Sequence, residues 1–541
     1  MHKYSIVILL SLFAIGVYSQ NVTTSNLPLI LIDTQGKNIV DEPKITARMN
    51  IIDNANGENN INDNSFVFKG FIGIEIRGNT AQMYDKKSYS LETRTSSGEN
   101  LNVSLLGMPP ENDWVLHGPY SDKSLIRNAL AYHLGNSQGR WSPRTQFCEV
   151  FINGEYRGVY VFVEKIKIDK NRVDIAKLKP EENSGDQLTG GYIISIDRDN
   201  PGSWNSPFLG RTGSVDVPFT YVDPDYEDLT TTQQQYIRDY ITDFEYALHG
   251  TDFKDPELGY RPYIDVISFI DYFIITELSR DLDGYRVSVY FHKDKDSKGG
   301  KLVMSPFWDY NLCFGNGNFM QANNPIGWTE DGIGRGDWYE VPFWWDRLRE
   351  DPYFETYLKY RWNELRENSF SKSSINAFID SCANVLDEAQ VRNFQKFRIL
   401  DRYVWPNAYI GGTYENEIAY LKGWISDRLD WLDSQIDLIV PAFEITGNNE
   451  KLAENYQITA FPNPFKEKVT LRFNLAQNAK VDVIIRNALG QVVLSRSETC
   501  NSGFNELTFG SEAFNQNNSL YFYSVSVDNI VIQNGKLLKM Y

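Results

Sequence analysis

Two carboxylates, Asp283 and Asp309, stand in surroundings that suggest chemistry. Asp283 lies in SRDLDGYRVSVYF, a stretch that predicts a turn between a buried helix and a strand, and Ser288 follows five residues later. Asp309 ends KLVMSPFWD, which predicts a buried strand, and aromatic residues flank it. A carboxylate among aromatic rings loses roughly several kcal/mol of hydration unless a cation, a metal ion or hydrogen-bond donors compensate. Asp309 therefore needs such a partner.

The order of these residues is similar to a pattern of protein kinases. There, a catalytic Asp precedes a metal-binding Asn by five residues, and a second Asp after a hairpin holds magnesium. Asp283 and Asp309 occupy the two acidic places, and Ser288 stands where the pattern has Asn. A turn Asp and a strand-end Asp paired with an arginine is the structural alternative. Glycoside hydrolysis by paired carboxylates is another, with Asp283, Asp309 and Glu164 as candidates.

The elements that must position these residues predict an α+β chain. Residues 27–197 indicate strands and turns, with a hairpin turn at Asn153-Gly154 and one helix, SLIRNALAYHLG, that we expect to end at Gly135. From about residue 230 the pattern changes to long helices, of which PYIDVISFIDYFIITELSRD is apolar nearly all round and should be buried. A small hairpin interrupts the helices, and its turn, DKDSKGG, lacks the ligands of a calcium loop.

Composition limits the function classes. The chain has 541 residues and a formal net charge of −18, and this negative charge argues against nucleic acid as a partner. Its four cysteines are too widely scattered for a zinc site or a dense disulfide scaffold. Residues 1–20 have the basic start, apolar run and small-residue exit of a secretory signal peptide, and no later stretch predicts a transmembrane helix. We therefore expect an exported protein.

The last part of the sequence predicts a separate domain. The periodicity of the helices fades into a polar linker at residues 441–456. Residues 457–541 then alternate apolar and polar positions between turn signals, which is typical of a small β-sandwich. The preceding domain spans residues 21–440.

Several segments are similar to the spore-coat CotH kinase family, an atypical group of secreted or surface protein kinases. They occur in consistent order between about residues 28 and 440: IEIRGN (74–79), KKSYSLE (86–92), LIRNALAYHL (125–134), EVFINGEYRGVYVFVEKI (149–166), GGYII (190–194), DLDGYRVSVYF (281–291) and PFWDYNLCFGN (306–316). The resemblance implies a two-lobed kinase-like fold, with a β-rich first lobe and a mainly helical second lobe. It also implies ATP, Mg²⁺ or Mn²⁺, and phosphorylation of serine or threonine on an unidentified protein substrate.

The resemblance also implies site residues. Asp283 is the expected catalytic residue, and Asp309 and Ser288 are the expected metal ligands. Lys87 is the expected phosphate-binding lysine, because alternation places it on the apolar face of its strand and leaves Lys86 facing solvent.

Three more residues are expected at the nucleotide. Arg77 and Asn79 would shape the loop over the phosphates, and Glu164 would contact the nucleotide or form a structural salt bridge. The sequence departs from the kinase pattern because it has no G-x-G-x-x-G loop and no Glu in the helix SLIRNALAYHL. A catalytically weak surface binding or adhesion protein is therefore the alternative.

The C-terminal sandwich is similar to the type IX secretion sorting domain. The segments that carry this resemblance are FPNPF (461–465), NALGQVV (487–493) and the closing GKLLKMY. They imply handling by the type IX secretion machinery and a secreted or cell-surface location.

Overall fold

The computed structural model describes residues 22–55, 57–332, 337–443, 458–475, 479–487, 491–514, 519–527 and 530–540. The expected signal peptide and most of the expected linker lie outside these residues. The chain divides into two compact units, residues 1–441 and 442–541, and each is described by itself. No helix in the described part is long and apolar enough to cross a membrane.

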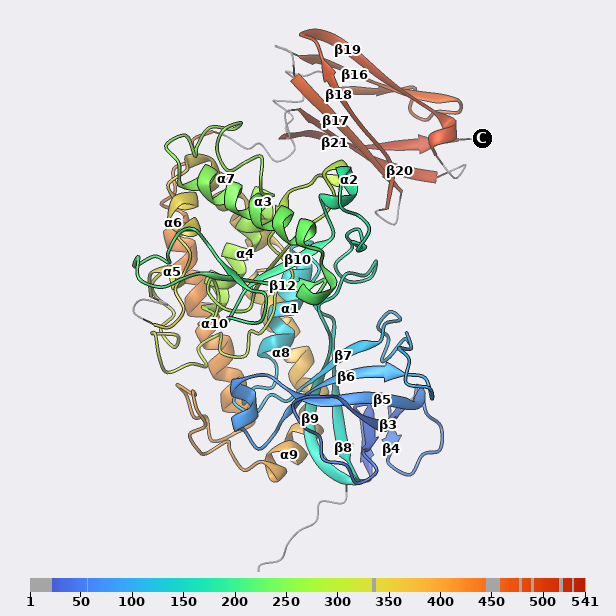
Figure 1. The fold of residues 1–541 in the computed structure, drawn as a ribbon, viewed down its shortest axis with the longest axis vertical. Helices are drawn as coiled ribbons and strands as arrows, with labels where there is room; N and C mark the ends of the chain where they lie inside the picture. Colours follow the sequence, from blue (N-terminus) through green and yellow to red (C-terminus); the bar gives the residue numbers. More distant parts are fainter. Residues whose placement is uncertain are drawn as a thin grey trace, which may run out of the picture. The chain divides into compact units, whose positions relative to one another are not determined.

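A closed β-barrel forms the first part of the larger unit (Figure 1). Its strands follow one another around the barrel in the order β2-β3-β5-β6-β7-β9-β8. Their bounds are β2 (Leu29–Asp33), β3 (Ile45–Ile52), β5 (Phe68–Arg77), β6 (Ser88–Arg94), β7 (Asp113–His117), β8 (Thr145–Ile152) and β9 (Glu155–Glu164). Apolar side chains from all of these strands, among them Ile72, Trp114 and Phe162, fill one buried core. A short pair, β1 (Thr24–Ser25) and β4 (Asn59–Asn60), lies outside the barrel order.

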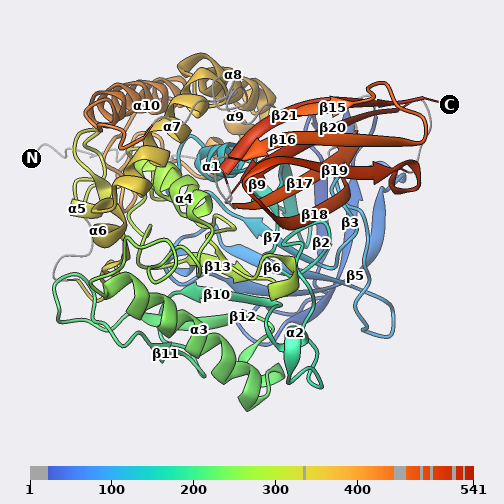
Figure 2. The ribbon, with the colours of Figure 1, turned by 90° about the horizontal axis from the view of Figure 1, so that it is seen from above.

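A second sheet and the helices form the rest of this unit. The sheet has the order β11-β12-β10-β13-β14, with β10 (Tyr192–Ile196), β11 (Trp204–Asn205), β12 (Pro218–Asp223), β13 (Val289–Lys293) and β14 (Leu302–Val303). The longer helices are α1 (Arg127–Ser137), α3 (Thr231–His249), α4 (Val266–Ser279), α7 (Pro352–Glu367), α8 (Lys372–Val385), α9 (Asp387–Lys396) and α10 (Tyr414–Ile436); the shorter ones are α2 (Gly185–Leu188), α5 (Thr329–Gly332) and α6 (Trp344–Arg349). Figure 2 shows α7, α8 and α10 running next to one another. The fold is mixed α+β, as the sequence predicts.

The buried helix α4 leads directly to the first carboxylate. Its residues from Ser268 to Ser279 are all buried, which confirms the prediction from its apolar sequence. Asp265 caps its start by accepting a hydrogen bond from the amide of Ser268, and Arg280 ends it in the left-handed conformation, at φ 48°. The chain then turns away through Asp283 into β13, so that a fully packed helix fixes the start of this turn.

Helix α1 differs from the prediction at its end. It continues past Gly135 to Ser137, so the expectation that this glycine ends the helix is wrong. A Cβ on Gly135 would lie 2.3 Å from the ring of Phe307 and 2.4 Å from the hydroxyl of Ser142. The glycine therefore allows the segment that carries Asp309 to pack closely against α1.

The two hairpin predictions have different outcomes. β8 and β9 form the predicted hairpin, and Asn153 and Gly154 both have positive φ, as its tight turn requires. The predicted strand through Asp309 is much shorter, because β14 covers only Leu302–Val303. Asp309 thus lies in a loop, and its φ of 67° is unusual for a residue with a side chain.

The smaller unit consists of two antiparallel sheets. One has the order β15-β16-β19 and the other β18-β17-β20-β21, and they share one apolar core. The bounds are β15 (Thr459–Phe461), β16 (Lys468–Leu475), β17 (Ala479–Asn487), β18 (Val492–Cys500), β19 (Gly503–Gly510), β20 (Ser519–Val527) and β21 (Ile530–Lys539). Alternation is clear in β17, where Val481, Val483 and Ile485 are buried between more exposed neighbours.

Candidate active site

A cleft of about 110 Å³ lies where the barrel meets α1 and the turn after α4. The barrel side contributes residues at or near the ends of β5, β6, β7 and β9, and the other side contributes α1 and four loops. The residues that carry polar groups into it are Arg77, Asn79, Ser88, His117, Asn128, Tyr132, Arg198, Asp283, Ser288, Asp309 and Asn311. Five of the residues singled out in the sequence therefore meet here: Arg77, Asn79, Asp283, Ser288 and Asp309.

The backbone of Asp309 is held from α1. Its amide donates a hydrogen bond of 3.2 Å to the hydroxyl of Tyr132. The buried guanidinium of Arg127 donates to the carbonyl oxygens of Cys313 (3.0 Å) and Phe314 (3.3 Å), just beyond Asp309. These bonds hold the left-handed loop in place, so the carboxylate is presented to the cleft by a rigid support.

The aromatic residues around Asp309 have a second use. The ring of Trp308 stacks on Tyr132, with centroids 6.1 Å apart, and the guanidinium of Arg77 lies 5.2 Å from the centre of the Trp308 ring. The rings thus position a cation beside the carboxylate as well as excluding water from it. Burial nevertheless raises the pKa of Asp309 to about 6, and the carboxylate of Asp283 adds to the rise. The nearby arginines therefore do not fully compensate its charge.

Asp283 has a more balanced environment. Burial raises its pKa, whereas the positive charges of Arg286 and Arg198 lower it. The guanidinium of Arg286 lies 3.7 Å from the Asp283 carboxylate and also pairs with Asp337 at 2.5 Å. A carboxylate that faces a cleft can accept a proton from a bound hydroxyl.

Within the described part of the chain, two buried polar atoms in the cleft have no hydrogen-bond partner: Nη1 of Arg77 and Oδ1 of Asn128. Buried polar groups are nearly always paired, so each such atom requires an explanation. The guanidinium needs an acceptor, whereas the amide oxygen and the Asp309 carboxylate need a cation or a donor. A phosphate group accompanied by a divalent cation would meet all three needs.

The structure contradicts the expected orientation of the two lysines. Lys86 is buried, not solvent-facing, and its amine donates to Oδ1 of Asn393 at 2.9 Å. Burial lowers the pKa of Lys86 to about 7. Lys87 is half-buried, and its amine donates to the carbonyl oxygens of Gln82 and Tyr84. Both lysines precede β6, which begins at Ser88, so strand alternation does not extend to them.

The described residues that line the cleft do not include Lys87 or Glu164, so the expectation that both share it with Asp309 is wrong. Glu164 is buried on the opposite face of β9 from Val163, which does line the cleft. Its carboxylate forms two hydrogen bonds with the guanidinium of Arg144, at 2.8 and 2.9 Å. The structural salt bridge is therefore the alternative that holds for this residue.

We expect Glu164→Gln to lower the free energy of unfolding by about 1–3 kcal/mol, because it weakens a buried pair of charge-assisted hydrogen bonds. Nucleotide affinity should not change. Urea unfolding and calorimetric titration with ATP measure the two effects. The matched control is Glu155→Gln. Glu155 is on the same strand as Glu164 and forms an exposed ion pair with Lys396 of α9, so this change should lower the free energy of unfolding by less than about 1 kcal/mol. A loss of nucleotide affinity with unchanged stability would contradict the structural role.

Sequence reasoning missed several residues of the cleft. Asn128 and Tyr132 lie one helical turn apart on α1, and this spacing, which places two polar side chains on one face of the helix, was the available signal. Arg198 follows β10, and nothing in its local sequence connects it with Asp283. Asp281 was visible as a third acid in the same turn; burial and the nearby carboxylates of Asp283 and Asp309 raise its pKa well above the usual range.

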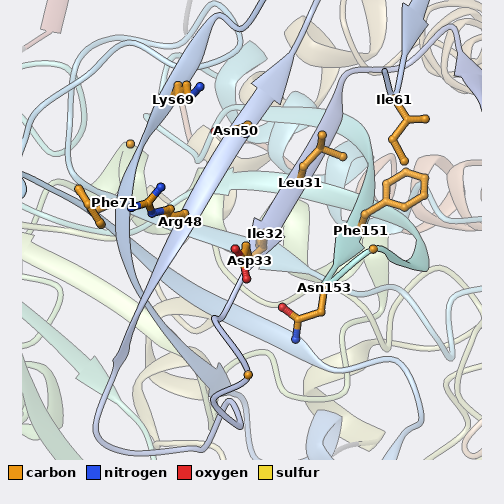
Figure 3. Close-up of a pocket in the computed structure, with 13 residues that line it drawn as sticks. Leu31, Ile32, Asp33, Arg48, Asn50, Ile61, Lys69, Phe71, Phe151 and Asn153 are labelled. Atoms are coloured by element: carbon orange, nitrogen blue, oxygen red, sulfur yellow. The ribbon is translucent and has the colours of Figure 1, made fainter. Parts of the chain in front are cut away.

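A larger hollow lies elsewhere on the barrel (Figure 3). It has a volume of about 970 Å³ and lies over β2, β3 and β5, with Arg48, Lys69 and Phe71 among its lining residues. Asp33 is the one carboxylate among these described residues, and none of the buried polar atoms without a partner lines it. This hollow is therefore large, but it has few groups that could catalyse a reaction or bind a metal ion.

The side chains of the cleft can be compared with the ligands that a divalent metal ion needs. Within the described ranges, no three His, Cys, Asp or Glu side chains converge closely enough to hold a metal ion by themselves. Mg²⁺ usually binds through one or two carboxylates together with substrate phosphates rather than in an all-protein cage. The Asp309 carboxylate, which lies in the same cleft as the unpaired Nη1 of Arg77, fits that mode of binding.

Two known families match parts of this chain. Residues 74–432 match the family described as CotH kinase protein, and residues 459–539 match the secretion system C-terminal sorting domain. A curated relative is the inner spore coat protein H of Bacillus subtilis (strain 168), which is 22% identical over 247 residues. The match covers 45% of this chain and 59% of that protein, so the chain spans somewhat more than half the length of this relative.

A solved structure, the proinflammatory kinase CtkA of Helicobacter pylori, aligns with 68% of this chain and 95% of its own. Its identity is 10% and its TM-score 0.28, which is too low to support an argument about the fold.

Proposed function

Because this chain belongs to the CotH kinase family, we propose that it is a secreted or surface protein kinase that transfers the γ-phosphoryl group of ATP to serine or threonine. The barrel and the helical part would be the two lobes of a kinase-like domain, with the nucleotide between them. The observation that carries the proposal is the cleft in which Asp283 and Asp309 face an arginine with an unpaired donor.

The roles follow from the charges of the residues. Arg77 would bind the phosphates, Asn79 would shape the loop over them, and Asp309 would bind Mg²⁺ or Mn²⁺ beside them. The metal, when bound, neutralises charge on the phosphate oxygens. Asp283 would orient the acceptor hydroxyl and take its proton. Ser288, a weaker neutral ligand than Asn, would complete the site.

One observation favours the second candidate, a surface binding protein without transfer activity. Neither Lys86 nor Lys87 lines the cleft, and the cleft of about 110 Å³ is smaller than the roughly 300–1,000 Å³ typical of ligand pockets. A nucleotide would need the two sides of the cleft to separate. ATP binding in solution is therefore the first discriminating property.

The test is incubation of the purified mature chain with γ-labelled ATP and Mg²⁺ or Mn²⁺, with casein and the chain itself as acceptors. Label that survives conditions that hydrolyse acyl phosphates, and that is recovered as phosphoserine or phosphothreonine, supports the proposal. The absence of transfer to any serine or threonine would favour the binding protein, and the absence of ATP binding as well would exclude the kinase.

We also propose that the C-terminal sandwich directs export through the type IX machinery and contributes nothing to activity. The family match at residues 459–539 supports the proposal, as does the separate core of this unit.

Deletion of residues 457–541 should therefore leave the protein in the periplasm of its native host, while the purified truncated protein keeps the parent's urea midpoint and activity. Cell fractionation and urea unfolding measure the two results. Fusion of the same segment to an unrelated periplasmic protein should carry that protein out. Surface delivery of the truncated chain at the parent's level would contradict the role.

A further inference from the structure

Asn128 is a buried polar residue of the cleft to which no role is assigned so far. It is 6% exposed, lies at the start of α1 and lines the same cleft as Asp283 and Asp309. Its Oδ1 has no hydrogen-bond partner in the described chain. An amide oxygen buried without a partner destabilises the fold, so a purely structural role gives no reason for an asparagine here.

The cleft contains a possible donor that does not bond to this oxygen. Nη1 of Arg77 is also without a partner, although both side chains line one small cleft. The two groups are complementary but do not bond to each other, so each is available to a different part of a bound ligand. Arg77 requires an anion, and Asn128 requires a cation or a donor.

A divalent cation is the partner that the neighbouring groups favour. The cleft presents the carboxylates of Asp283 and Asp309, yet no three acidic, His or Cys side chains converge in the described residues. A hard cation must then take further oxygen ligands, and an amide carbonyl is one that such ions accept.

A buried ion pair occupies the start of α1. The carboxylate of Asp122 accepts hydrogen bonds from the backbone amide of Arg127 (2.9 Å) and from its guanidinium (2.6 Å). These two side chains neutralise each other, so neither adds an unpaired charge to the start of the helix that carries Asn128.

We propose that Asn128 binds the divalent cation of the cleft through its amide oxygen, beside Asp309. This inference rests on the proposed nucleotide function, because that function is the reason to expect a cation. It gives α1 a metal ligand, Asn128, although the helix lacks the Glu that protein kinases have in the corresponding helix. Asn128 thus does from α1 part of what a third carboxylate would do.

The experiment measures Mn²⁺ binding, with and without ATP, to the full mature chain by electron paramagnetic resonance of free Mn²⁺. Asn128→Leu should weaken Mn²⁺ binding about 10-fold or more, the scale of losing a partner at a metal site. Asn128→Asp should bind Mn²⁺ at least as tightly as the parent, because it keeps an oxygen and adds a negative charge. If instead the amide nitrogen donates to phosphate, Asn128→Asp should lose ATP binding, and that result would overturn the proposal.

Thermal unfolding supplies a second readout and a matched control. Asn128→Leu should be at least as heat-stable as the parent without metal, because the unpaired oxygen is removed, but it should gain less stability from added Mn²⁺. Asn136→Leu, on the same helix, should be less stable without metal and keep the parent's gain, because the side chain of Asn136 is bonded to the backbone of Tyr132 and Ser142.

The outcomes separate this inference from the proposed function. Phosphoryl transfer by the parent, together with parent-like Mn²⁺ affinity in Asn128→Leu, would overturn the role of Asn128 and leave the kinase proposal standing. Mn²⁺ binding that depends on Asn128, without transfer to any acceptor, would support the metal role and reject the kinase. A parent chain that binds no Mn²⁺ even with ATP would overturn the inference directly.

Discussion

Replacement of Asp309 by Ala should abolish metal-dependent binding of ATP. The carboxylate is held in a left-handed loop by bonds from Tyr132 and Arg127, and burial raises its pKa to about 6, which indicates a charge that lacks its counterion. Calorimetric titration with ATP and Mn²⁺ measures the effect. If the variant binds the nucleotide with metal as tightly as the parent does, the kinase assignment of this carboxylate is wrong and the surface-binding alternative replaces it.

The same carboxylate should govern part of the pH dependence of stability. A raised native pKa means that the folded chain keeps a proton that the unfolded chain, with a pKa near 3.8, releases at lower pH. The free energy of unfolding should therefore decline as the pH rises from about 4 to about 6, and Asp309→Asn should lack that part of the decline. At pH 7, without metal, this variant should be more stable by roughly 1–3 kcal/mol. Urea unfolding at several pH values tests both statements.

Asp283→Ala should have the opposite profile, with nucleotide binding largely intact and the chemical step slowed by roughly 10²-fold or more, the usual scale for losing a general base. The structural reason is that Asp283 lies with Arg286 and Arg198, which partly balance its charge, so that it is better suited to a proton than to a metal. Single-turnover transfer from labelled ATP gives the rate, and calorimetry gives the affinity.

The control for Asp283 is Asp239→Ala, which removes an exposed carboxylate from α3 and should change neither quantity. A rate for Asp283→Ala within a factor of about three of the parent would exclude the role of base. Loss of ATP and Mn²⁺ binding in the same variant would instead place Asp283 among the metal ligands.

Long periodic segments were predictable from the sequence because burial dictates their pattern. The buried helix α4, the hairpin of β8 and β9, and the alternating strands of the C-terminal unit all follow from which positions are apolar. The two acids of the cleft were also found, because a carboxylate among aromatic residues is costly and therefore noticeable.

The wrong predictions concern residues whose conformation or burial depends on contacts with residues far away in the sequence. Gly135 looked like a helix end, but its missing side chain makes room for Phe307. Lys86 was expected to be exposed, but its amine donates a hydrogen bond to Asn393, which lies in α9, 307 residues later in the chain. Arg198 and Asn128 meet Asp283 and Asp309 only through the packing of α1 and β10, which no local pattern records. Alternation along β9, by contrast, did place Glu164 opposite Val163 and was available from the sequence.

Helix α9 also bears on the order in which the chain can fold. It packs on β9, and its Arg392 pairs with the fully buried carboxylate of Glu149 in β8, 243 residues earlier. Until α9 has been synthesised, that carboxylate has no cation and favours solvent over the closed barrel. The barrel is therefore unsuited to folding by itself while the rest of the chain is still emerging from the ribosome.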